Sequence, residues 1–211
     1  MAPKNVQLVW SIMANISIII AITGFYIVLR GLNLGGQAIL TLAFFVIALA
    51  IQIGINIVNA KSVCINDPSN NHMGYVFGYT LLPYFLILGS IMLIIKIFPG
   101  WKAPFSNTIG YLFVKGAIKK NLGSPKDILS NMKRKNIDFS SFINELTEDN
   151  FNSSIESLNK LNSDINFDNS NKTNVLKLIR FKQGIAEGIW YLLAGSLAVS
   201  VSTNSILNIQ C

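Results

Sequence analysis

Four long stretches of the sequence are almost free of charge, and they limit what the chain can fold into. They run from about 6 to 29, 36 to 58, 74 to 96 and 184 to 211. A transmembrane helix needs about 20 mostly apolar residues to cross the hydrocarbon core, and each stretch is long enough. A helix on a soluble core would show polar residues at every third or fourth position. The sequence therefore predicts an all-α integral membrane protein with four transmembrane helices.

The overall composition agrees with this class. Charged residues make up 13% of the chain, whereas roughly a quarter is usual in soluble domains. This excludes a disordered chain, a coiled coil and a small disulfide-rich module. The remaining alternative is three spans with one re-entrant segment. The first stretch favours a signal anchor over a cleaved signal peptide, because only Lys4 precedes it and its apolar run is too long.

A polar insert, residues 97–183, separates the third and fourth stretches. The window from Lys96 to Lys182 holds 14 of the 17 basic residues and eight of the ten acidic ones. Basic loops stay on the cytosolic side of a membrane. We therefore expect the insert to be cytosolic, together with the turn at Arg30. The N-terminus, the 59–73 loop and the C-terminus would then lie on the opposite side.

The insert opens with an aromatic segment that follows the third stretch. Two prolines and a glycine between positions 99 and 104 predict a turn that lies against the membrane and interrupts the helix. Aromatic side chains suit the headgroup region, and the expected interfacial anchors are Phe98, Trp101, Phe105 and Tyr111. Residues 111–120 then mix apolar and basic side chains, which indicates a short interfacial helix attracted to anionic lipid.

The rest of the insert predicts a small helical domain. Ser124 and Pro125 can open a first helix, and Thr173 with Asn174 can cap a last one that continues into the fourth stretch. Two amphipathic helices are expected between them, on the apolar positions Phe139, Phe142, Ile143 and Leu146, and Ile155, Leu158 and Leu161. A domain of this size is marginal alone. We expect it to lean on the membrane or on a partner.

Three features stand out within the apolar stretches. Pro83 removes one backbone hydrogen bond in the third and predicts a kink, either for packing or as a hinge. Gly184 and Gly188 are spaced as small residues that let two helices pack closely, most simply within one chain. Glu187 is the one acidic residue at the edge of a span, and the sequence favours a solvated or paired carboxylate at headgroup depth.

The sequence has two cysteines, and the predicted topology places both on the non-cytosolic side. Cys64 follows the second stretch and Cys211 ends the fourth. A disulfide between them would close a very long loop and restrain the unfolded chain. An oxidising compartment and a short Cα–Cα distance are both required. Free thiols, as are common near chain ends, are the alternative.

The sequence contains no pattern typical of catalysis. His72 is the single histidine, and one imidazole without nearby carboxylates or thiols does not make a metal site. Nucleophile-elbow and phosphate-loop motifs are absent. The basic run at 133–135 is most simply a solvated face and not a nucleic-acid site. We therefore expect no enzyme activity, no cofactor, no metal, no nucleic acid and no small-molecule substrate.

The fourteen residues from Phe98 to Tyr111, together with the general layout, resemble small multi-pass membrane proteins of nucleocytoplasmic large DNA viruses. The resemblance implies a protein of the virion inner membrane, associated with minor capsid proteins through residues 97–183. Without it, the endoplasmic reticulum or another cellular membrane is expected.

Two functional classes remain open. The first is a structural protein that anchors or scaffolds an assembly at a membrane, with the bilayer and other membrane or capsid proteins as partners. The second is a small channel, transporter or membrane-remodelling protein. A pore needs a polar stripe along its spans, and the sequence offers scattered candidates such as Asn15, Gln52 and Asn56. The absence of Asp, Lys and Arg within the spans counts against transport.

Overall fold

The computed structural model describes residues 4–34, 36–64, 72–121, 138–161 and 169–209, and all their regular structure is helical. The chain divides into two compact units, which are treated separately below. Unit 1 comprises residues 1–26, 36–99 and 188–211, and unit 2 comprises residues 27–35 and 100–187. Two helices, α1 (Lys4–Leu32) and α10 (Asn169–Leu207), contribute residues to both units.

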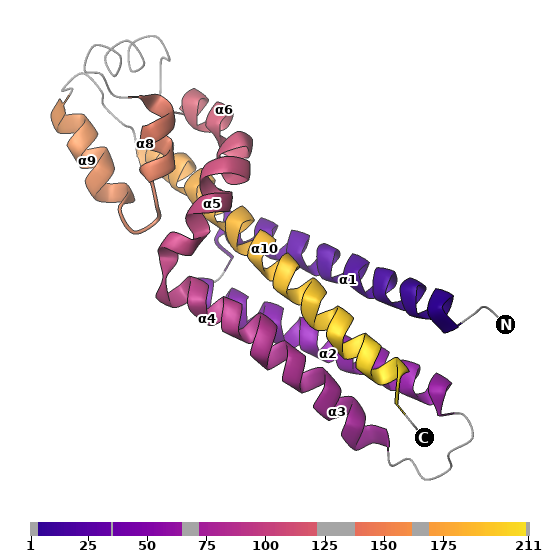
Figure 1. Ribbon diagram of the computed structural model, residues 1–211. Coiled ribbons are helices and arrows are strands. Elements are labelled where there is room, and N and C mark those ends of the chain that lie inside the picture. Colours follow the sequence, from indigo (N-terminus) through magenta and orange to yellow (C-terminus); the bar gives the residue numbers. More distant parts are fainter. Residues whose placement is uncertain (1–3, 35, 65–71, 122–137, 162–168, 210–211) are drawn as a thin grey trace. The chain divides into compact units, whose positions relative to one another are not determined.

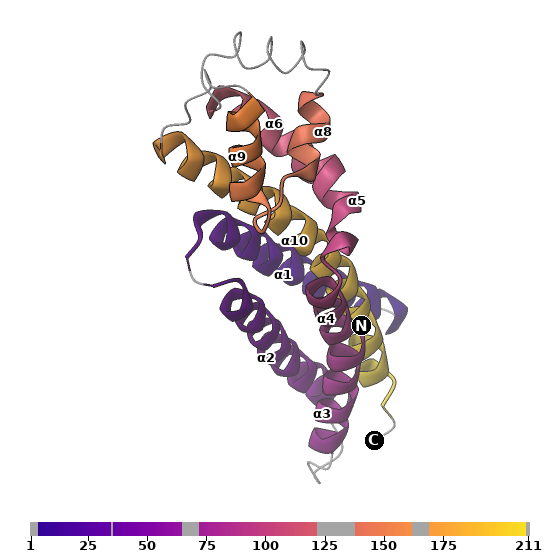
Figure 2. The same cartoon turned by 90° about the vertical axis from the view of Figure 1, so that its left-hand side faces the viewer.

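Four helical segments are long and apolar enough to cross a membrane, which confirms the predicted all-α class and the four apolar helices. They are Val9–Leu32 in α1, Gln37–Val63 (α2), Met73–Ile97 and Ser170–Leu207 in α10. Figures 1 and 2 show these elements as long rods, with α2 beside the α3–α4 segment. Large apolar side chains such as Trp10, Ile39 and Leu86 are more than half exposed. Such outward-facing surface is what a lipid-solvated bundle requires.

The third span is built from three consecutive pieces. They are α3 (His72–Pro83), a π-helical segment η1 (Tyr84–Gly89) and α4 (Ser90–Ile97). Pro83 cannot donate a backbone hydrogen bond, and a widened π turn is one way for a helix to absorb that loss. His72, expected in a loop, is the first residue of α3.

The segment after the third span differs from the predicted turn. The helix breaks only at Phe98, where φ is −118° and ψ is 78°. Helical structure resumes at once as η2 (Pro99–Lys102), α5 (Ala103–Phe105), the π-helical η3 (Ser106–Gly110) and α6 (Tyr111–Asn121). Pro99 and Pro104 stand at or near the start of a helical piece. Proline is tolerated there because the amide it lacks would have no intrahelical partner. The predicted interruption of the helix is confirmed at Phe98, but the segment after it is helical, so the expectation of a turn there was wrong.

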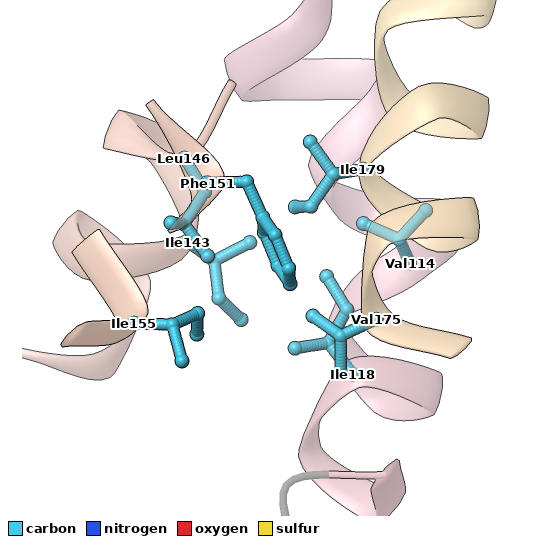
Figure 3. Close-up of a cluster of buried hydrophobic side chains, with 8 residues drawn as sticks. All are labelled: Val114, Ile118, Ile143, Leu146, Phe151, Ile155, Val175 and Ile179. Carbon is cyan, nitrogen blue, oxygen red and sulfur yellow. The ribbon is translucent and has the colours of Figure 1, made fainter. Parts of the chain in front are cut away.

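Unit 2 has a hydrophobic core of its own. The described helices are α6, α8 (Phe139–Glu145), α9 (Phe151–Leu161) and the first part of α10. Figure 3 shows apolar side chains from all four converging on one another: Val114, Ile118, Ile143, Leu146, Phe151, Ile155, Val175 and Ile179. Each is at most 3% exposed. These helices therefore bury more than their few apolar positions suggested.

The helix ends in unit 2 have recognisable causes. Asp138 caps α8, because its carboxylate accepts hydrogen bonds from the Ser141 amide at 2.9 Å and the Ser141 hydroxyl at 3.1 Å. These hydrogen bonds hold the pKa of Asp138 below its usual range. The last helix begins at Asn169 and not at the Thr173–Asn174 cap. The helix predicted to open at Ser124 lies outside the described residues, as do positions 133–135.

Candidate functional site

Polar side chains scattered through the sequence form one hydrogen-bonded cluster inside unit 1, here called the polar core. Its centre is Asn56 of α2, which is fully buried. The Asn56 amide donates to the Thr80 hydroxyl at 2.8 Å and to the Ser202 hydroxyl at 2.6 Å. Its side-chain oxygen accepts from the Gln52 amide at 3.0 Å. Asn56 therefore ties α2 to α3 and α10.

The same core includes α1. Asn15 and Gln52 both donate to the Thr203 hydroxyl, at 3.1 Å and 3.2 Å. All four candidate spans thus share one network, with the residues Asn15, Gln52, Asn56, Thr80, Ser202 and Thr203, each at most 2% exposed. In a membrane, polar side chains hold helices together because hydrocarbon offers them no other partner.

An aromatic cluster packs in the same unit. The rings of Tyr26, Phe44 and Tyr191 contact one another with centroids 5.3 to 5.5 Å apart. All three side chains are at most 3% exposed. The hydroxyls of Tyr26 and Thr41 form a hydrogen bond at 3.3 Å. Together with the polar core, this cluster contributes buried side chains from α1, α2 and α10.

Unit 2 contains buried ion pairs that the sequence did not reveal. Glu187 has no exposed side-chain surface, and its carboxylate lies 3.2 Å from Lys102 Nζ and 3.6 Å from Arg30 Nε. The expectation of a carboxylate at the surface was wrong: the residue is paired but fully buried. The two cations come from other elements, α1 and η2, rather than from the basic residues that precede Glu187 in α10.

Glu148 extends this charge cluster, whose members are Arg30, Lys102, Glu148, Arg180 and Glu187. One carboxylate oxygen accepts from Arg30 Nη2 at 2.7 Å and the other from Arg180 Nε at 2.6 Å. Burial alone would raise the pKa of Glu148, but the hydrogen bonds from Arg30 and Arg180 outweigh it and leave the pKa below its usual range. Arg30 therefore bridges two carboxylates that are far apart in the sequence.

Lys182 stabilises the unit in a different way. Its side chain is buried, and Nζ donates to the backbone carbonyls of Ile143 at 2.7 Å and Asn144 at 3.2 Å. These carbonyls belong to the last turn of α8, where helical oxygens lack intrahelical partners and the helix dipole favours a cation.

Three glycines permit the close approach of helices in unit 2. A Cβ atom on Gly110 would lie 2.7 Å from the backbone oxygen of Lys182. One on Gly31 would lie 2.8 Å from the Phe181 ring, and one on Gly184 would lie 2.9 Å from Arg30 Cγ. The sequence singled out Gly184 and Gly188. Gly188 is buried. Gly31 and Gly110 were missed, although Gly35 and Ser106 give each of them the same four-residue spacing of small residues.

The predicted interfacial anchors do not share one environment. Phe98 and Trp101 are 57% and 48% exposed, as an interfacial role requires. Phe105 and Tyr111 are half-buried. The Tyr111 hydroxyl forms a 2.7 Å hydrogen bond with Ser140, and its ring packs against the core of unit 2. An interfacial position therefore suits the first two residues better than the last two.

Cys64 ends α2, is buried and is disulfide-bonded. Cys211, the only other cysteine of the sequence, lies outside the described residues, so the predicted pairing stays a prediction. Within the described part of the chain, no three His, Cys, Asp or Glu residues gather in a way that could hold a metal ion.

Comparison of the chain with protein families, curated protein sequences and solved structures gave no match. The polar core and the charge cluster are therefore the features of the chain that bear on its function. Both arrangements join helices that are distant in sequence, and both direct their polar atoms at one another. Internal hydrogen bonds and ion pairs of this kind hold helices in position.

Proposed function

We propose that the protein is a structural multi-pass membrane protein that anchors a protein assembly at a membrane. The observation that carries the proposal is the polar core. The amides and hydroxyls that could have lined an aqueous path hydrogen-bond to one another, and they are at most 2% exposed. The resemblance of residues 98–111 supports the more specific proposal of a virion inner membrane and capsid partners.

The insert supplies the surface for such an assembly. Lys115, Lys119 and Lys120 on α6 are exposed, and so is Lys177 on α10. These side chains lie outside the charge cluster, so they can meet an acidic partner without disturbing the buried pairs. Complementary charge guides association and fixes orientation more than it adds affinity.

The predicted orientation has a direct test. Two glycosylation sequons lie in the insert, at Asn152 and Asn171, and Asn152 is exposed on α9. We expect neither to be modified in a eukaryotic cell, because a cytosolic insert never meets the glycosylation machinery. A mass decrease on glycosidase treatment would show that the insert faces the lumen.

The partner proposal is tested with the full-length chain, purified in mild detergent from the membranes in which it is made. We expect a stoichiometric complex whose chemical cross-links fall on Lys115, Lys119 and Lys120. The double variant Lys119→Glu/Lys120→Glu should lose the partner. Lys61→Glu, an exposed lysine outside the insert, is the matched control and should retain it. If the two variants recovered the same amount of the partner protein, docking through the insert would be contradicted.

A further inference from the structure

A groove opens on the surface of unit 1 between α2 and the third span. Its volume is about 540 Å³, and its walls include Leu42, Phe45, Phe85 and Leu93. Gly89, at the end of the π-helical segment, lines it as well and leaves room where a side chain would stand. Leu42, Phe85 and Leu93 are each more than half exposed. The π-helical segment that follows Pro83 therefore borders a groove that hydropathy and residue spacing do not predict.

One end of the groove is polar and the other is apolar. Lys96 and Gln37 line the polar end, and Lys96 is exposed near the C-terminus of α4. Phe45 and Phe85 pack edge to face, with centroids 5.3 Å apart, towards the middle of the spans. No acidic residue is among the residues that line the groove. An apolar pocket with a single cation at its mouth matches a molecule with an apolar chain and an anionic head.

The length of the groove favours a lipid over another helix. The helical rise between Gln37 and Phe45 is about 12 Å, and the rise between Phe85 and Lys96 is about 16 Å. The groove therefore reaches roughly half-way across a hydrocarbon core of about 30 Å. A lipid from one leaflet fills that depth, whereas a packed helix would follow the whole span.

We propose that this groove binds one anionic phospholipid, with an acyl chain between Phe45 and Phe85 and its phosphate near Lys96. Lys96 leads into the basic insert, so the lipid comes from the leaflet next to that insert. The cytosolic leaflet is the anionic one, which agrees with the predicted orientation. The proposal is independent of whether the insert binds a protein.

The test is native mass spectrometry of the full-length protein after reconstitution in nanodiscs with equal amounts of phosphatidylglycerol and phosphatidylcholine. We expect one retained phosphatidylglycerol. Lys96→Gln should lower the preference for phosphatidylglycerol about fivefold, since one basic residue near the membrane contributes on this scale. Lys61→Gln, an exposed lysine at the other end of α2, should leave the preference unchanged.

Two further variants test the apolar part of the groove independently of the charge on Lys96. Ala38 and Leu42 are exposed residues of the groove, so Ala38→Trp or Leu42→Trp should fill it and abolish retention of both lipids. The thermal midpoint in detergent shows which of the two variants folds. Equal retention of the two lipids by the unaltered protein would overturn the proposal. A lipid-free dimer that the tryptophan variants dissociate would also overturn it, and would assign the groove to a second copy of the chain.

Discussion

Unit 1 buries neutral side chains, such as Asn56 and Thr203, that hydrogen-bond to one another, whereas unit 2 buries charged ones, such as Glu187 and Lys182. The difference follows the cost of desolvation. A charge at the centre of a bilayer is expensive even when paired, while an amide or hydroxyl can be satisfied by one or two hydrogen bonds. The chain therefore places its ion pairs in the unit that contains the polar insert. Substitutions in the charge cluster should therefore destabilise the protein more than substitutions in the polar core.

The largest effect is expected in the charge cluster. Glu187→Gln removes the carboxylate that faces Lys102 and Arg30. Arg30 keeps its pair with Glu148, whereas the largely buried Lys102 loses its carboxylate partner. We expect about 3 kcal/mol of destabilisation, because a buried pair that loses one member leaves an uncompensated charge. Reversible unfolding in mixed detergent measures it. The control is Glu156→Gln on α9, whose exposed pair with Lys160 should contribute about 0.5 kcal/mol or less. Equal effects of the two substitutions would contradict the burial of Glu187.

In the same unfolding experiment, a Gly→Ala substitution where helices approach closely should destabilise the protein more in unit 2 than in unit 1. Gly110→Ala places a Cβ 2.7 Å from a backbone oxygen that cannot move aside, and should cost about 2 kcal/mol. Gly195→Ala in unit 1 meets the flexible Ile19 side chain at 3.2 Å and should cost less. Gly116→Ala in α6 has open space and should stabilise slightly, by about 0.5 kcal/mol. Destabilisation by Gly116→Ala as large as by Gly110→Ala would contradict the close approach.

The polar core should respond more weakly to a single change. Asn56→Leu deletes hydrogen bonds to three partners in unit 1, and we expect a loss of about 1 to 2 kcal/mol, since hydrogen bonds between membrane helices average about 0.6 kcal/mol each. Asn204→Leu on α10 is the control, because Asn204 is exposed and its side chain accepts a local hydrogen bond from Asn208 at 3.2 Å. A neutral Asn56→Leu would show that the core does not hold the spans together.

The smallest expected effect is a dependence of stability on pH, and it should be confined to unit 2. The pKa of Glu148 is lower when folded than its ordinary value of 4.5. Its pairs with Arg30 and Arg180 therefore stabilise the fold above pH about 4.5, and that contribution is lost as pH falls through the lower folded value. Hydrogen exchange measured between pH 6 and 3 should show α8 losing protection before α2. Glu148→Gln should reduce this difference between the helices and leave the part that comes from Asp138, whose carboxylate caps α8 and also has a lowered pKa. An unchanged difference in the variant would assign the whole effect to Asp138.

The sequence predicted much of the fold because hydropathy over 20 residues is a local property. The four apolar helices and the amphipathic α8 and α9 all follow from it. The polar core does not follow from hydropathy, since Asn15, Gln52, Asn56 and Thr203 meet only when the three helices α1, α2 and α10 take a particular rotation and depth. Each looked isolated in the sequence.

The charge cluster was missed for a related reason. The basic residues nearest to Glu187 in the sequence are Lys182 and Arg180, but these contact α8 and Glu148 instead. The actual partners of Glu187, Arg30 and Lys102, lie on α1 and η2, and Gly31 and Gly184 let α1 approach α10 closely. The helical structure after Phe98 was not predicted, because Pro99 and Pro104 indicate an interrupted helix, whereas in the structure they lie at or near the start of a new helical piece.

We propose that the protein acts as a scaffold and not as a pore, because the polar groups of the polar core hydrogen-bond to one another. Ion flux through liposomes that contain the purified protein tests it most directly, with a known channel-forming peptide as the positive control. We predict the same flux as in protein-free liposomes, for the unaltered chain and for Asn204→Leu. Selective flux through the unaltered chain that Asn56→Leu abolishes would contradict the claim and make the polar core the lining of a channel.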